Sequence, residues 1–207
     1  MLSLALIPMM SQVACLLPQT SGSLDADTGP AVVVSDVRVL SGDLVCMLPG
    51  EADVRAIDGA LLPAGPAPCR APELVRVTRV IDGDTFDAWP MSGLGGAESV
   101  RIIGVNTPET YGAPQCWGPE AADFAEQVLD LRLLWLTFDH DCEDDFGRTL
   151  AYVHLSDDSA CFFERLLLRG GLAETMTFAE TSTFADTFSD DARWADDAEI
   201  GLWQACD

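Results

Sequence analysis

Hydrophobic and polar positions alternate along several short segments after residue 70, most clearly at residues 74–81. Alternation with period two is typical of a β-strand that buries one face. The pattern predicts five strands, at residues 74–81, 85–89, 100–105, 133–138 and 150–155. Asp82-Gly83 is expected to turn the chain between the first two strands. With helices between them, these strands predict a mixed α and β fold that leans towards antiparallel pairing.

Apolar residues spaced three and four positions apart predict helices between the strands. One helix is expected to start at Gly118-Pro119, where the missing N–H of proline costs nothing. A second is expected over residues 162–169, where the glycine pair that follows stops it. Ser189 is the expected N-cap of a last helix that ends near Gly201.

The first 70 residues differ from the rest of the chain. Residues 1–20 form a signal-like segment, residues 21–70 a tether with a small extension, and residues 71–207 the main domain. In the extension, residues 32–34 and 37–40 each favour a strand, and residues 59–68 favour a loop. No chemistry can be assigned to this extension from its residue types.

The apolar stretch Met1–Met10 resembles the core of a secretory signal, although it lacks the usual basic start. Val13-Ala14-Cys15 resembles the end of a bacterial lipoprotein signal, in which the cysteine becomes lipidated. Membrane attachment through Cys15 and plain secretion therefore both stay open. Either outcome places the protein outside the cytoplasm, as a secreted, periplasmic or cell-envelope protein.

Cysteine usage also indicates an oxidising compartment. Setting Cys15 aside leaves six cysteines, which allow about 15 pairings. Cys46 and Cys69 are expected to pair, because both lie before the main domain. Buried free thiols are the alternative, and the spacings lack the close pairs of a zinc site.

The charge of the chain is strongly one-sided. Asp and Glu number 34 against 11 basic residues, which gives a net charge of −23, and every basic residue is an arginine. Such a charge should repel nucleic acid at long range. It fits solubility or a salty habitat, since salt would let local arginines act. A chain that does not bind nucleic acid is the alternative.

Three polar motifs carry the candidate chemistry. They are Asp82-Gly83-Asp84-Thr85, Arg101-Ile102-Ile103-Gly104-Val105-Asn106-Thr107-Pro108-Glu109 and Asp145-Phe146-Gly147-Arg148. Together they offer oxygen ligands for a hard cation, a carboxylate for proton transfer and two arginines. This set suits attack on a phosphodiester, in which guanidinium groups hold charge that builds on phosphoryl oxygens.

From about Val75 to Trp203 the chain resembles the staphylococcal nuclease-like (thermonuclease) family. Besides the three motifs, Gly118-Pro119-Glu120-Ala121, Gly171-Leu172-Ala173 and Gly201-Leu202-Trp203 follow in the family's order. The resemblance implies an α+β fold, a five-stranded OB-fold β-barrel with about three helices. It also implies a calcium-dependent nuclease that hydrolyses DNA and RNA to 3′-phosphate and 5′-hydroxyl ends. We expect a monomer.

By the same resemblance, Glu109 is the general base, and Arg101 and Arg148 bind the phosphate. Asp84 and the position of Asn106 bind calcium through side chains, and Thr107 binds it through its backbone carbonyl. Asn106 departs from the family, which has a carboxylate there. The amide keeps an oxygen ligand but removes one negative charge, so calcium affinity should fall or another divalent cation should be preferred.

Other readings stay open at this level. Asp84 could cap its turn, the arginines could form surface ion pairs, and the chain could be a non-catalytic OB-fold binding module. The base-stacking candidates are Tyr111, Trp117 and Tyr152, although for any single one of them packing in the core is the expected role. Asp145 is expected to hold its loop, and His140 and His154 to be scaffold residues.

Overall fold

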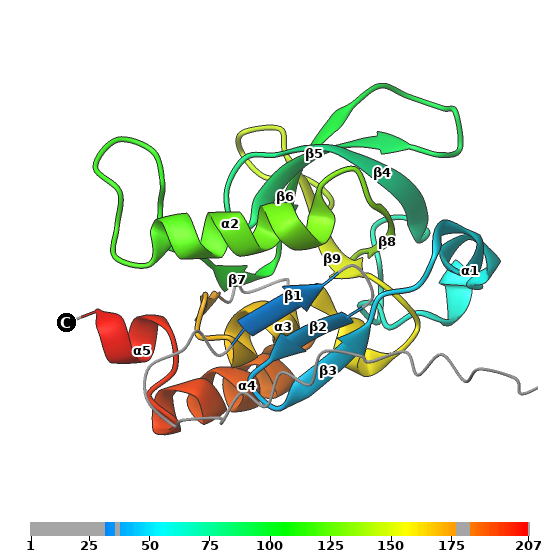
Figure 1. The fold of residues 1–207 in the computed structure, drawn as a ribbon. Coiled ribbons are helices and arrows are strands. Elements are labelled where there is room, and N and C mark those ends of the chain that lie inside the picture. Colours follow the sequence, from blue (N-terminus) through cyan, green and yellow to red (C-terminus); the bar gives the residue numbers. More distant parts are fainter. Residues whose placement is uncertain (1–31, 36–37, 177–182, 207) are drawn as a thin grey trace, which may run out of the picture.

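The computed structural model describes residues 32–35, 38–176 and 183–206 (Figure 1). The signal-like segment, with Cys15, lies outside the described residues. Among the residues described, no helix is long and apolar enough to cross a membrane.

Five strands close into a barrel, which confirms the predicted α+β architecture. Their order around the barrel is β4 (Glu73–Val80), β5 (Thr85–Pro90), β6 (Glu98–Ile102), β9 (Thr149–His154) and β8 (Leu133–Thr137). Neighbours pair antiparallel except β6 and β9, which run parallel. The inward apolar side chains, such as Val77 and Phe86, are fully buried.

The predicted strand at residues 100–105 is broken in two at Ile103, just before Gly104. β6 ends at Ile102, and β7 (Gly104–Asn106) pairs instead with β10 (Glu174–Met176), a strand that the pattern did not predict. Gly104 has φ +85°, and a Cβ there would lie 2.4 Å from the Phe188 ring. Only glycine fits this corner without strain. The break separates β7, which carries Asn106, from the barrel strand that carries Arg101.

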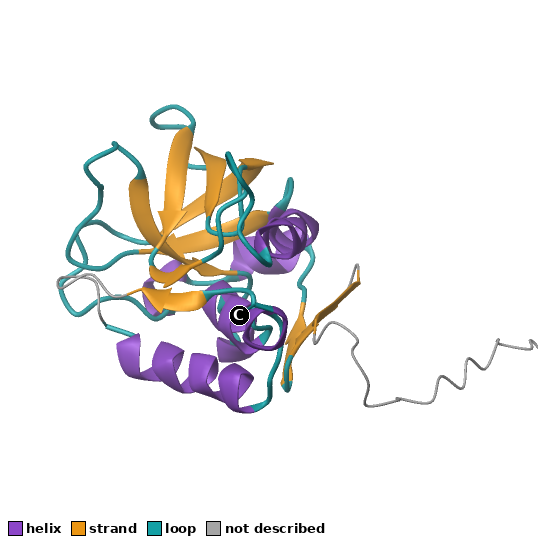
Figure 2. Cartoon of the chain, turned by 90° about the vertical axis from the view of Figure 1, so that its left-hand side faces the viewer, coloured by secondary structure: helices purple, strands orange, loops and turns teal. Residues whose placement is uncertain are grey.

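Helices cover one side of the barrel (Figure 2). They are α2 (Gly118–Leu129), α3 (Phe163–Arg169), α4 (Ala185–Asp197) and α5 (Leu202–Ala205). The start of α2 agrees with the prediction, but Ser189 is not an N-cap. α4 begins at Ala185, because Phe184 and Phe188 pack their rings on Tyr152. Aromatic burial outweighs the capping preference of a serine here.

The N-terminal extension forms a three-stranded antiparallel sheet with order β1 (Val32–Ser35), β2 (Arg38–Ser41) and β3 (Leu44–Met47). β3 was not predicted, nor were α1 (Glu51–Ala56) and the 3₁₀ turn η1 (Gly59–Leu61) inside the expected loop. The sheet lies beside the helices, away from the barrel (Figure 2). Its inward residues Val39 and Cys46 are fully buried in the common core.

All six described cysteines form disulfides: Cys46–Cys161, Cys69–Cys142 and Cys116–Cys206. The predicted Cys46–Cys69 pair is therefore wrong, and so is the reading as free thiols. Cys46 lies on β3, which packs on the short turn that ends at Cys161. Cys69 instead lies beside the segment after β8, where its N–H donates to the Asp139 carbonyl at 2.7 Å. Cys46 and Cys69, which are successive cysteines along the sequence, therefore form disulfides with different partners.

Glu164 and His154 are ionisable residues that are buried in the core. Glu164 is fully buried and accepts from the Val153 N–H at 3.1 Å, and burial raises its pKa well above the ordinary value. His154 stacks on Phe162 and shares a 2.9 Å hydrogen bond with the Thr137 hydroxyl. Burial lowers the pKa of His154 to about 4, so this side chain is neutral at physiological pH. A buried, hydrogen-bonded imidazole is a scaffold residue.

Candidate active site

A cleft of about 600 Å³ opens at one end of the barrel. Five of the six predicted site residues line it: Asp84, Arg101, Asn106, Glu109 and Arg148. They come from the β4–β5 turn, β6, β7, the segment before α2 and the loop before β9. The sixth, Thr107, is buried directly behind Asp84.

The turn between β4 and β5 places Asp84. The Asp84 N–H donates to Asp82 Oδ1 at 3.1 Å, which closes a tight aspartate turn. Gly83 lies so close to Thr107 that a Cβ would approach its side chain to 2.6 Å. A residue with a side chain at position 83 would push Thr107 away, so the glycine lets the turn and the chain after β7 touch.

Four hydrogen-bond and ionic contacts hold the Asp84 carboxylate. Its Oδ2 accepts from the Thr107 N–H at 2.8 Å and from the Thr107 hydroxyl at 3.1 Å, and it lies 3.1 Å from Arg101 Nη2. Its Oδ1 accepts from the Thr85 hydroxyl. Burial raises the pKa of Asp84, while the charge of Arg101 and the Thr107 N–H oppose that shift. Asp84 is thus more than a turn cap.

Arg101 is nearly as buried as Asp84. Its Nη1 donates to the carbonyls of Ile102 and Val105, and its Nη2 lies 3.2 Å from Asn106 Oδ1. Burial lowers the pKa of Arg101, Asp84 opposes the shift, and the positive charge of Arg148 adds to it. The guanidinium nevertheless stays charged at any working pH. It is held as a fixed positive charge in the cleft.

Glu109 lies on an exposed segment whose backbone is fixed. Its N–H donates to Gln115 Oε1 at 2.8 Å, and its carbonyl accepts from the Gln115 N–H at 2.9 Å. The next residue, Cys116, is tied to Cys206 beyond α5. Gly118 packs against the Glu109 carbonyl, where a Cβ would come within 2.7 Å. The carboxylate therefore faces solvent from a rigid backbone.

Arg148 is held by Asp144 and not by the predicted Asp145. Asp144 Oδ1 accepts the N–H groups of Phe146 and Arg148, both at 2.9 Å, and its Oδ2 accepts Arg148 Nε at 2.7 Å. Asp145 is exposed at the tip. Position 144 lies two residues before the Phe146 N–H and four residues before the Arg148 N–H. A carboxylate at that position can accept both hydrogen bonds of the turn.

Two cleft residues were missed from the sequence. Phe146 is 84% exposed and lies under the Arg148 guanidinium, and Met176 Sδ lies 3.7 Å from Arg101 Nη2. Phe146 could have been proposed from the sequence, because it lies inside the Asp145-Phe146-Gly147-Arg148 motif. Nothing in the sequence indicated Met176. Tyr152 is wrong as a stacking residue, because it is 1% exposed and its hydroxyl donates to Asp139.

Oxygen donors suited to a hard cation gather at the Asp84 end of the cleft. Asp82, Asp84 and Asn106 line it, and the chain continues from Asn106 into Thr107. No group of three Asp, Glu, His or Cys residues is arranged to hold a metal in the described part of the chain. The donor chemistry therefore fits calcium only if amide or backbone oxygens join the carboxylates.

Comparison with known proteins decides the family. The staphylococcal nuclease homologue family model matches residues 99–205, slightly more than half of the chain. This chain belongs to the staphylococcal nuclease family. The matched range contains Arg101, Glu109 and Arg148 but begins after Asp84, so Asp84 is tied to the family site by its contact with Arg101.

Several curated relatives are similar over about half of this chain. The thermonuclease of Staphylococcus intermedius is 42% identical over 100 residues, which cover 47% of this chain and 56% of that protein. The thermonuclease of Staphylococcus hyicus is 41% identical over 101 residues, with the same coverage. The SPbeta prophage-derived endonuclease YokF of Bacillus subtilis is 36% identical over 107 residues, 49% of this chain and 34% of that protein. The chain thus spans about half the length, or less, of these relatives.

Proposed function

We propose that this chain is a nuclease that hydrolyses phosphodiester bonds of DNA and RNA, leaving 3′-phosphate and 5′-hydroxyl ends. The observation that carries this proposal is the convergence of Arg101, Glu109 and Arg148 with Asp84 in one cleft. These residues come from separate segments, and their arrangement suits phosphoryl chemistry. Relatives named thermonuclease and endonuclease support the same reaction class.

Glu109 is the proposed general base. Its carboxylate is exposed at the cleft, so a water molecule can reach it, while its backbone is fixed on both sides by Gln115. A base must lie within hydrogen-bond reach of the water whose proton it takes. As the water attacks phosphorus, its proton passes to a Glu109 oxygen, the P–O5′ bond breaks, and the leaving 5′-oxygen takes a proton from solvent, which gives a 3′-phosphate and a 5′-hydroxyl.

The two arginines are proposed to hold the charge of the phosphoryl group. Arg148 uses Nε for Asp144, which leaves its two Nη groups to donate to phosphate oxygens as a fork. Arg101 contributes fixed positive charge from the cleft wall, where low exposure makes that charge act strongly. A preorganised pair of positive charges of this kind stabilises the transition state more than the bound substrate.

We further propose calcium, or another divalent cation, as the cofactor. Asp84, Asn106 and the Thr107 carbonyl would hold the ion, with Asp82 in support. Bound there, the cation would supply positive charge that orients and neutralises the phosphate. Because Asn106 is neutral, these ligands carry less negative charge than a set with two carboxylates. The expected affinity for calcium is therefore lower.

The three disulfides fit an oxidising compartment outside the cytoplasm. Secretion, or attachment to a membrane through lipidated Cys15, is proposed from the sequence alone. The monomeric state is likewise a proposal.

A non-catalytic binding module is the second candidate, favoured by Asn106 and by the net charge of −23. One experiment separates the two. Purified protein is incubated with single-stranded DNA in calcium, magnesium or chelator at several salt concentrations. Calcium-dependent cleavage to 3′-phosphate ends, lost in Arg148→Ala but kept in Arg193→Ala, is expected. Arg193 is the control because it forms an exposed ion pair on α4. No cleavage by folded protein under any condition would favour the binding module.

A further inference from the structure

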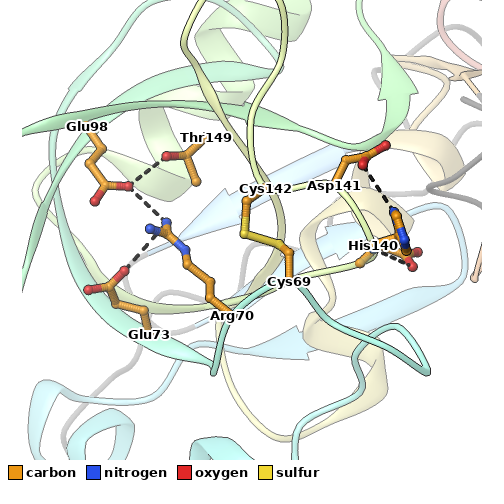
Figure 3. The surroundings of a disulfide bond; sticks show 9 residues. Cys69, Arg70, Glu73, Glu98, His140, Asp141, Cys142 and Thr149 are labelled. Atoms are coloured by element: carbon orange, nitrogen blue, oxygen red, sulfur yellow. Dashed lines mark hydrogen bonds and ion pairs between the residues drawn. A yellow bond between two sulfur atoms is a disulfide. The ribbon is translucent and has the colours of Figure 1, made fainter.

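The N-terminal extension ends beside the cleft. Cys69 N–H donates to the Asp139 carbonyl at 2.7 Å, and Cys69 forms a disulfide with Cys142. The next residue, Arg70, stacks its guanidinium over Phe138 at 4.3 Å. Figure 3 shows the disulfide and the Arg70 side chain next to each other. Two consecutive residues of the extension therefore contact the segment that leads from β8 into the cleft.

Residues 142–150, which we call the Arg148 loop, form a short hairpin. The Leu150 N–H donates to the Cys142 carbonyl at 2.9 Å, and Glu143 pairs with Thr149 as an antiparallel bridge. The Asp144 N–H donates to the Arg148 carbonyl at 3.0 Å. Cys142 and Thr149 thus lie at the base of the hairpin that carries Arg148, one on each of its arms.

Two consecutive residues of the extension hold the two arms, Cys69 the first arm and Arg70, through Glu98, the second. The first arm is fixed covalently through Cys142 to Cys69. On the second arm, the Thr149 hydroxyl donates to Glu98 Oε2 at 2.7 Å, and Arg70 Nη2 lies 2.9 Å from that same oxygen. Figure 3 shows this line of contacts from Arg70 through Glu98 to Thr149.

The loop needs such a restraint, because its own charges oppose its shape. Asp141, Glu143, Asp144 and Asp145 all line the cleft, and like charges at this spacing repel one another. Within the loop, Arg148 pairs with Asp144 alone. Phe146 at the tip is almost fully exposed and adds little packing. Anchors at the base of the loop would oppose this repulsion and so keep Arg148 in place.

We propose that Cys69 and Arg70 are positioning residues that hold the two arms of the Arg148 loop, which makes the N-terminal extension part of the catalytic apparatus. The proposal rests on the nuclease function proposed above. It gives Cys69 and Arg70 a role beyond covering the core, because they fix an arginine that they do not touch. A displacement of about 1 Å in a catalytic group can cost on the order of 100-fold in rate.

The first test compares two double variants of the full chain. Cys69→Ala/Cys142→Ala removes the proposed anchor. Cys46→Ala/Cys161→Ala is the matched control, since that disulfide joins β3 to a turn in the core and spans 115 residues against 73. In the chain-entropy model the longer loop contributes at least as much stability. The control therefore reports the cost of losing a disulfide as such.

Cleavage rates are measured well below both unfolding temperatures. We expect the first variant to lose about tenfold or more in kcat with a smaller change in KM, since substrate contacts other than Arg148 remain. The control should stay within about twofold of the wild type in kcat. Equal kcat values in the two variants would overturn the proposal.

A single substitution keeps the test decisive if the double variant fails to fold. Glu98→Ala removes the link between Arg70 and Thr149, whereas Glu73→Ala removes the other, longer ion pair of Arg70 at 3.5 Å. Only Glu98→Ala should lower kcat. Identical kcat in both variants would refute the role of the second arm.

Hydrogen exchange separates this proposal from the nuclease proposal, because it needs no activity. The N–H groups of Asp144, Arg148 and Leu150 are each hydrogen-bonded inside the loop. In Cys69→Ala/Cys142→Ala they should exchange at least about tenfold faster than in the Cys46→Ala/Cys161→Ala control. If cleavage is absent from every form but this difference appears, the anchor stands and the nuclease proposal fails. Unchanged exchange of these groups overturns the anchor.

Discussion

The two halves of the cleft are built differently. Asp84 and Arg101 come from the barrel, where the Arg101 side chain is 9% exposed and meets acceptors on several sides. Glu109 and Arg148 come from loops, and the Arg148 side chain is 32% exposed with Asp144 as its carboxylate partner. The strand-borne half is positioned by burial, and the loop-borne half has no comparable packing.

Covalent bonds compensate for this difference. The loop-borne half has a disulfide at each of its two segments, Cys116–Cys206 beside Glu109 and Cys69–Cys142 at the base of the Arg148 loop. Functional groups on loops need a rigid support to keep a productive geometry. The comparison teaches that the groups proposed to meet the substrate are exposed, and that cross-links take the place of a packed core around them.

Among the substitutions that test this comparison, Glu109→Gln should have the largest effect, which is on the rate of cleavage. An amide cannot take the proton of the attacking water, so turnover should fall by about 100-fold or more. Stability should change little, because the side chain is exposed. Steady-state cleavage of single-stranded DNA and a urea unfolding curve measure the two quantities.

The matched control for this base is Glu120→Gln, an exposed glutamate near the start of α2. It makes the same chemical change a few residues away and should cleave at the wild-type rate. A Glu109→Gln protein that cleaves as fast as this control would remove Glu109 from the mechanism.

Truncating the two arginines tests the comparison directly. Arg101→Ala leaves the buried Asp84 without its cation and should lower the free energy of unfolding by about 3 kcal/mol. Arg148→Ala breaks a more exposed pair and should cost less than about 1 kcal/mol. Both should lose most cleavage activity. Urea unfolding of both variants checks the difference, and equal losses of stability would mean that the two halves are not built differently.

The sequence predicted the strand-borne half better than the loop-borne half. Alternation along residues 74–81 and 85–89 predicted two barrel strands and the turn that carries Asp84, because these depend on local pattern. The corner at Gly104 was missed, since it depends on how closely Phe188 approaches the backbone. The sequence left Tyr152 between base stacking and core packing, because all six residues of β9 are buried and the strand lacks the alternation that shows which side chains face inward.

In the loops, the sequence named the candidate residues that line the cleft but not the residues that support them. Asp144 and Asp145 are chemically identical neighbours, and only the register of the turn chooses between them. The disulfide partners of Cys69 and Cys116 lie 73 and 90 residues away. No local pattern specifies such a pairing, because it depends on which surfaces the fold brings together.

A smaller effect should follow from Asn106→Asp at the edge of the strand-borne half. The added carboxylate restores a negative ligand beside Asp84 and should tighten calcium binding by roughly tenfold. Titration calorimetry measures the change. Gln127→Glu, on the exposed face of α2, adds the same charge away from the cleft and is the control. Unchanged or weaker calcium affinity in Asn106→Asp alone would count against this set of ligands.

The last prediction separates titration in the cleft from titration in the core. The folded pKa of Glu164 lies well above its ordinary value of 4.5, so above pH 4.5 the folded state binds more protons than the unfolded state. Its contribution to stability therefore falls as pH rises. Glu164→Gln keeps an acceptor for the Val153 N–H. As pH rises, its free energy of unfolding should increase relative to that of the wild type by at most about 1.4 kcal/mol per pH unit.

The stability of Glu164→Gln must be compared with that of a second protein at each pH, because the titration of His154 changes stability with pH in the opposite direction. The folded pKa of His154 is about 4 against an ordinary value of 6.5, so the protein loses stability as pH falls from 6.5 to 4. Urea unfolding of Glu164→Gln and of the exposed control Glu126→Gln, each from pH 5 to 8, isolates the Glu164 contribution. A pH-independent difference would mean that Glu164 is ionised in the folded protein. The pH profile of cleavage should be the same in Glu164→Gln and in the wild type, because the proposed proton acceptor, Glu109, belongs to the loop-borne half and not to the core.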